Sequence, residues 1–176
     1  MLSAQLEALR KARGYHYSDL VEMTGLCTQA VVAVHRGRGM TDSLNKIAKA
    51  YYHYVVIPGQ RPDVPLGAQL RAHRLANGIS LRSASESSGV AVKTIERIER
   101  GEVCYVGVVV AYTEAIATTL TLIDQGEYEY RRTRAELADW ESSRTLPADV
   151  WLYDDALTVH MQRRVDRADR WRGRHV

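Results

Sequence analysis

Residues 66–101 read LGAQLRAHRLANGISLRSASESSGVAVKTIERIERG, and this stretch decides the fold. Apolar residues recur at helical spacing in three short runs, which glycines separate. The pattern predicts helices over about residues 66–77, 81–87 and 92–99, with a tight turn on Gly89 between the last two. Two short helices joined by such a glycine turn form a helix-turn-helix unit. Further start and stop signals are Ser80 as an N-cap and Gly78 and Gly101 as C-caps.

The same pattern occurs 64 residues earlier. Residues 1–37 and 65–101 align without a gap and are identical at positions 2, 4, 5, 6, 8, 10, 12, 14, 22, 25, 36 and 37 of the first copy. Chance would give about two or three identities. The first copy is therefore expected to repeat the three helices, over about 2–13, 18–23 and 28–35.

The repeat continues after one extra residue in the second copy. The matches that follow are Leu44, Ile47, Ala50 and Tyr51 with Val109, Tyr112, Ala115 and Ile116. This register favours a helix for the valine-rich 106–112 stretch, which could otherwise be read as a strand. The predicted fold class is all-α. The predicted core residues at inward positions are Leu6, Leu20, Val31, Val34, Ile47, Leu70, Ala84, Ile95, Ile98 and Tyr112.

Three of the four prolines fall between the two copies, in residues 55–65 (VVIPGQRPDVP). Each removes an amide donor and restricts φ, so this segment is predicted to be an extended linker, with a reach of at most about 35 Å. The predicted organisation is a first helix-turn-helix domain (1–54), the linker (55–65), a second helix-turn-helix domain (66–122) and a C-terminal helical region (123–176).

The C-terminal region is predicted to hold helices at about 125–142 and 153–171. The second would carry an apolar stripe of Leu157, Met161, Val165 and Ala168. Such a stripe can pack on the chain's own domains. Alternatively, it can form a surface for self-association or for a protein partner, and both alternatives stay open.

Residues 66–101 resemble the lambda-repressor/Cro-like helix-turn-helix family, also called the XRE family. The SGV turn, Ile95 and the closing RIERG carry the resemblance, and LSAQLEALRKARGYHYSDLVEMTGLCTQAVVAVHRGRG (residues 2–39) matches the same frame less closely. The resemblance implies two lambda-repressor-like domains in tandem. It also implies double-stranded DNA as the partner, with the third helix of each unit in the major groove.

Outward positions on the third helix of the second copy are candidate base readers. Lys93 and Arg97 can donate to guanine, Glu96 can accept from cytosine, and Val92 and Thr94 can touch a thymine methyl group. Arg82 opens the preceding helix, where it can meet a phosphate.

The first copy offers a different, uncharged face at the equivalent positions. Gln29 is suited to adenine, and Thr28 and Ala30 flank it. Ser18 takes the place of Arg82, and Arg36 and Arg38 could contact the DNA backbone. Because the two faces differ, an asymmetric DNA site is expected.

The resemblance also implies an ion pair between the arginine of the first helix and the acidic residue two before the final glycine. Arg74 and Glu99 fit this structural role. The first copy has Arg10 opposite His35 instead.

The composition excludes several other classes of protein. The net charge is +3, with 45% hydrophobic and 26% charged residues, and no run of 18 apolar residues predicts a membrane span. The N-terminus does not resemble a signal peptide, and two cysteines fit a reducing cytoplasm. No metal-ligand spacing, P-loop or catalytic triad stands in a supporting context. We expect no cofactor, no metal, no membrane association and no enzymatic activity.

These features together predict a sequence-specific DNA-binding transcriptional regulator in the cytoplasm. A repressor of the phage or mobile-element type fits by resemblance. The alternative is a protein-interaction adaptor, such as an antitoxin or anti-repressor, in which only the second domain binds DNA.

Overall fold

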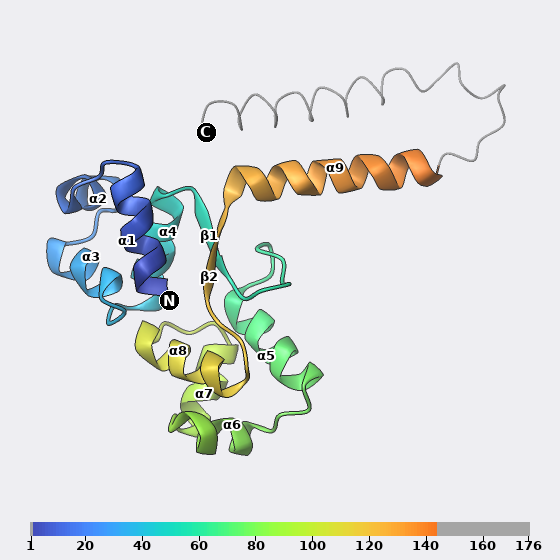
Figure 1. Ribbon diagram of the computed structural model, residues 1–176. Helices are drawn as coiled ribbons and strands as arrows, with labels where there is room; N and C mark the ends of the chain where they lie inside the picture. Colours follow the sequence, from blue (N-terminus) through green and yellow to red (C-terminus); the bar gives the residue numbers. More distant parts are fainter. Residues whose placement is uncertain (1, 144–176) are drawn as a thin grey trace, which may run out of the picture. The chain divides into compact units, whose positions relative to one another are not determined.

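The chain begins with two blocks of four helices in the same order (Figure 1). In this computed structural model, which describes residues 2–143, the first block contains α1 (Leu2–Ala12), α2 (Tyr17–Thr24), α3 (Thr28–His35) and α4 (Thr41–Ala50). The second contains α5 (Leu66–Ala76), α6 (Leu81–Ser88), α7 (Val92–Glu99) and α8 (Val106–Ala115). The predicted helices are confirmed, and α3 and α7 begin and end at the predicted residues.

Glycines end these helices in the predicted way. Gly25 and Gly89 have φ values of 67° and 69°, which lie in the left-handed region that favours glycine. Ser80 accepts a hydrogen bond from the backbone N–H of Ser83 (3.0 Å), so it caps α6. The turn between the second and third helix of each block is therefore set by local backbone chemistry.

The predicted core is confirmed in both blocks. All ten predicted residues are buried, and they belong to one continuous apolar cluster that includes α1, α4, α5 and α8 side chains. The valine-rich 106–112 stretch lies in α8, as the repeat register predicted. Residues 2–123 form one compact unit, and a second unit begins at Asp124.

A small sheet adds to the helices, so the all-α prediction holds for most of the chain but misses two strands. β1 (His53–Val56) and β2 (Thr121–Asp124) pair as a two-stranded sheet (Figure 1). Each strand follows the last helix of its block. Both are only four residues long, too short for a period-two pattern to stand out in the sequence.

The predicted linker is not extended over its whole length. After β1 the chain turns, with Gln60 N–H donating to the Ile57 carbonyl (3.1 Å) and Val64 N–H donating to the Arg61 carbonyl (3.2 Å). The prolines remove donors, but they also favour turns, and Ile57 is fully buried. A reach of about 35 Å is therefore not available to this segment without unfolding it.

Gln69 of α5 holds this segment in place. Its side chain is fully buried. The Oε1 atom accepts from Ile57 N–H (3.1 Å), and Nε2 donates to the carbonyls of Arg61 (3.0 Å) and Val64 (2.7 Å). The repeat equivalent, Gln5, has a buried Oε1 without a hydrogen-bond partner among the described residues.

This difference predicts that alanine at position 69 lowers the free energy of unfolding more than alanine at position 5. Gln69→Ala leaves the buried Ile57 N–H and the Val64 carbonyl without their partner, so it should lower the free energy of unfolding by about 2–4 kcal/mol. Gln5→Ala removes a buried oxygen that has no partner and should change it by less than about 1 kcal/mol. Urea unfolding of the two variants measures this, and equal losses would contradict it.

The second unit begins with α9 (Gln125–Ser143), which confirms the predicted 125–142 helix. The predicted 153–171 helix and its apolar stripe lie outside the described residues. Within residues 2–143, no helix is long and apolar enough to cross a membrane.

Candidate nucleic-acid interface

The α7 helix presents a mixed polar face. Lys93 and Arg97, one helical turn apart, are exposed, whereas Ile95 and Ile98 on the opposite side are buried. The other three candidate base readers, Val92, Thr94 and Glu96, are half-buried. The helix therefore keeps two cationic side chains on its outer face while its apolar side joins the core.

Glu102 holds two arginines at the end of α7, a feature that the sequence reasoning missed. Its carboxylate accepts from Arg97 Nε (2.6 Å) and Arg100 Nε (3.0 Å). These hydrogen bonds hold the pKa of Glu102 below its usual range and raise that of Arg97. Since both groups are exposed, a phosphate or base can replace the carboxylate at little cost.

The second helices of the two blocks differ at their N-termini. Arg82 is exposed at the start of α6 and forms an ion pair with Glu86 (3.0 Å). Ser18 is exposed in the first turn of α2. Next to it, the carboxylate of Asp19 accepts from His16 N–H (2.8 Å). The α6 end is therefore better suited to a phosphate than the α2 end.

A hollow of about 440 Å³ lies over the outer face of α3. The residues that line it are Thr28, Gln29, Val32, Ala33, Arg36 and Arg38. It thus brings together four of the candidate residues of the first block, while Ala30 and Ser18 are not among its lining. The surface is apolar in the middle and has two arginines at one end, unlike the face of α7.

Glu96 lies one turn after Lys93 in α7, but it is half-buried, whereas Lys93 and Arg97 are exposed. Together with Arg71 of α5 and Arg100, it lines a second hollow of about 280 Å³ next to the Arg74–Glu99 pair. This position turns Glu96 toward α5 and α6.

The Arg74–Glu99 ion pair is present and almost fully buried. Arg74 Nε and Nη2 donate to the two carboxylate oxygens (2.7 and 2.9 Å), and Nη1 donates to the Ile79 carbonyl (2.9 Å). The Tyr112 hydroxyl also donates to Glu99. Burial by itself raises the pKa of Glu99, but the hydrogen bonds from Arg74 and Tyr112 outweigh it, so the pKa is lowered. The pair connects α5, α7 and α8.

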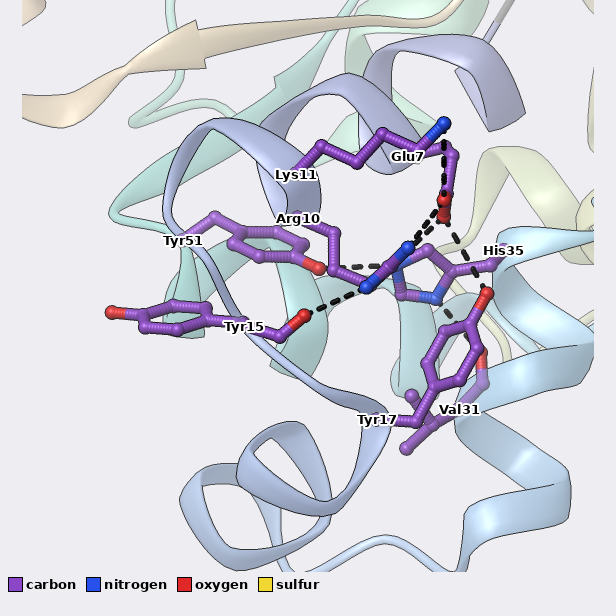
Figure 2. Close-up of polar contacts among 8 residues, drawn as sticks. All are labelled: Glu7, Arg10, Lys11, Tyr15, Tyr17, Val31, His35 and Tyr51. Carbon is purple, nitrogen blue, oxygen red and sulfur yellow. Dashed lines mark hydrogen bonds and ion pairs between the residues drawn. The ribbon is translucent and has the colours of Figure 1, made fainter.

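The first block replaces this pair by a tyrosine–histidine cluster (Figure 2). Arg10 makes the equivalent backbone contact, to the Tyr15 carbonyl (2.7 Å), but its acid partner is Glu7, one turn earlier in α1 (2.6 Å). His35 is buried, with Nδ1 2.9 Å from the Val31 carbonyl and Nε2 3.0 Å from the Tyr51 hydroxyl. A carbonyl only accepts, so Nδ1 carries the hydrogen and Nε2 accepts from Tyr51.

His35 should make stability depend on pH. Burial lowers its pKa, against the opposing contribution of the Val31 hydrogen bond. The unfolded chain takes up a proton near pH 6.5 while folded His35 stays neutral, so this stability is present above pH 6.5 and is lost as the pH falls below it. The expected slope is at most about 1.4 kcal/mol per pH unit.

Urea unfolding between pH 7.5 and 5.0 measures this slope. His35→Gln keeps a polar side chain that does not titrate, and it should flatten the curve. The same slope in both proteins would show that His35 does not contribute.

A comparison with protein families identifies the second block. Residues 65–125 match the family model described as a helix-turn-helix domain. Searches of curated proteins and of solved structures found no match for this chain. The second block with its following strand thus resembles helix-turn-helix domains, a class of DNA-binding module.

Proposed function

We propose that the protein is a sequence-specific regulator of transcription that binds double-stranded DNA in the cytoplasm. The observation that carries the proposal is the pair of exposed cations, Lys93 and Arg97, one turn apart on the third helix of the matched domain. Two such side chains suit the O6 and N7 acceptors of guanine. The role as a repressor of the phage or mobile-element type rests on the resemblance of residues 66–101 to lambda-repressor-like proteins.

We further propose that residues 1–54 form a second reader of the same kind, which makes the DNA site asymmetric. The faces of α3 and α7 differ in chemistry: Gln29 suits adenine, and the apolar centre around Val32 and Ala33 suits thymine methyl groups. Two modules on one chain raise each other's effective concentration to roughly the millimolar range, so two weak contacts give tight binding.

Selection of binding sites from random duplex DNA, at physiological salt, tests the proposal. A long, two-part, non-palindromic motif is the expected result. A short single motif would mean that α7 reads DNA alone. No enrichment of any motif would overturn the proposal.

The alternative function is a protein-interaction adaptor, such as an antitoxin or anti-repressor. The apolar hollow over α3 favours it, because such a surface also suits a protein side chain. The C-terminal region, with α9 and the helix that the sequence predicts at 153–171, is a second candidate surface for self-association or a protein partner. The double variant Lys93→Ala/Arg97→Ala separates the two functions: a regulator loses its activity, whereas an adaptor keeps its partner.

A further inference from the structure

The two blocks meet through a reciprocal backbone pairing. Met40 and Tyr105 form an isolated antiparallel bridge. Beside it, Thr41 N–H donates to the Cys104 carbonyl (2.8 Å) and Val106 N–H donates to the Gly39 carbonyl (2.8 Å). The two segments are equivalent in the repeat, because adding 65 to 39, 40 and 41 gives 104, 105 and 106. Met40 therefore pairs with its own equivalent, and the two hydrogen bonds exchange places when the two segments are exchanged. Such self-complementary pairing defines a local two-fold axis.

The residues just after the fourth helices, α4 and α8, are also related by the 65-residue offset of the repeat. Tyr52 and Ala117, again 65 residues apart, are non-glycine residues with φ values of 58° and 56°. This conformation is costly for residues with a Cβ atom, yet it occurs at the same place in each block. Tyr52 leads directly into β1, and the chain after Ala117 reaches β2 at Thr121. The two strands pair with each other, so the segments that follow the fourth helices join the two blocks a second time.

Side chains bury the contact between the blocks. Leu2 of α1 shares a small hollow with Val110 and Thr113 of α8, and the apolar cluster runs through both blocks without a break. Gln69 of α5 binds the segment after β1 through hydrogen bonds. Because this segment is held against α5, it cannot extend to change the distance between the blocks.

We infer that the two blocks form a fixed pseudo-dimer within one chain, so that α3 and α7 address two half-sites in inverted orientation at a single spacing. This inference rests on the proposed function. Tandem domains on a free linker would accept direct or inverted half-sites at many spacings. Here the 39–41/104–106 pairing, rather than the 55–65 segment, determines both the orientation and the spacing of the half-sites.

Proline substitutions can remove this pairing, together with the hydrogen bond that the Thr41 hydroxyl accepts from Cys104 N–H (3.1 Å). Thr41 and Val106 are the first residues of α4 and α8, where proline suits the helix because this N–H has no acceptor within the helix. The preceding residues, Met40 and Tyr105, are already in the extended region that proline requires. Thr41→Pro/Val106→Pro therefore removes the two donors, and Thr41→Val/Val106→Ala, which also lacks the hydroxyl but keeps both N–H groups, is the matched control.

The first measurement needs no DNA. In amide hydrogen exchange of the full chain, the N–H groups of Thr41 and Val106 should exchange at least about tenfold more slowly than those of Thr28 and Val92, which begin α3 and α7. Equal exchange rates would overturn the fixed pseudo-dimer.

The second measurement uses duplexes that carry the two selected half-sites in either orientation at spacings varied base pair by base pair. The wild type and the control should bind one inverted spacing at least about tenfold more tightly than the others. The proline variant should lose most of this preference while it still binds each half-site.

A Gly-Ser insertion after Gly59 should leave the preferred spacing unchanged. Preference for direct repeats, or a preferred spacing that shifts with the insertion, would overturn the inference. A chain with slow Thr41 and Val106 exchange that binds no duplex would overturn the proposed function and keep the pseudo-dimer.

Discussion

Replacement of Lys93 and Arg97 by alanine is expected to reduce binding to the selected DNA site by at least about 25-fold, because each cation that donates to a guanine contributes roughly a factor of five or more. Both side chains are exposed and do not belong to the core, so the fold should persist. Fluorescence anisotropy with the selected duplex and with a scrambled duplex, at several salt concentrations, gives the affinity and the specificity ratio together. The specificity ratio should fall along with the affinity.

A matched control removes one lysine and one arginine from outside α7. Lys46 and Arg131 are exposed, and each forms an ion pair four residues along its helix, with Asp42 and Glu127. Lys46→Ala/Arg131→Ala should keep the specificity ratio. If the two double variants weaken both duplexes equally, Lys93 and Arg97 contact phosphates and not bases.

The largest expected effect on stability comes from Glu99→Gln. This substitution keeps the size of the side chain but leaves the buried Arg74 guanidinium without a compensating charge; the side chains of the pair are only 6% and 7% exposed. Loss of one member of a buried pair costs about 3–5 kcal/mol, and a cooperative loss of helical circular dichroism in urea measures it. Because the pKa of Glu99 is lowered, the contribution of the pair is present above about pH 4.5 and is lost as the pH falls through the folded pKa.

The equivalent change in the first block is the control. Glu7, the acid partner of Arg10, is 34% exposed, so water can solvate Arg10 in its place and Glu7→Gln should change stability little. The double variant Arg74→Met/Glu99→Leu should recover part of the loss, since it removes the unpaired charge but leaves the Tyr112 hydroxyl and the Ile79 carbonyl without their partners. A loss below about 1 kcal/mol for Glu99→Gln would contradict the role of this pair.

Local chemistry explains why the helices could be predicted so closely. The signals act within a few residues of sequence: glycines at the C-caps, a serine N-cap and the spacing of Leu70, Ile95 and Ile98. In addition, the 64-residue repeat meant that helices predicted in one block supported those predicted in the other. The same reasoning identified Lys93 and Arg97 as exposed cations, because residues opposite a buried face must point outward. The resemblance, and not the periodicity, pointed to the Arg74–Glu99 pair.

Other features depend on contacts between distant residues, which no local pattern encodes. The 55–65 segment was expected to be extended because of its prolines, but the buried amide of Gln69 folds it against α5. Glu102 restrains Arg97 only because the chain turns back after Gly101. Likewise, His35 takes its partner from Tyr51, 16 residues away.

The two helical blocks, their caps, their core and the cationic face of α7 could therefore all be predicted from residue patterns. How the blocks are joined, through the 39–41/104–106 pairing and the β1–β2 sheet, became clear only from the folded chain. The physical reason is that backbone hydrogen bonds between segments 65 residues apart depend on where packing brings those segments, and main-chain donors and acceptors are the same in almost every residue.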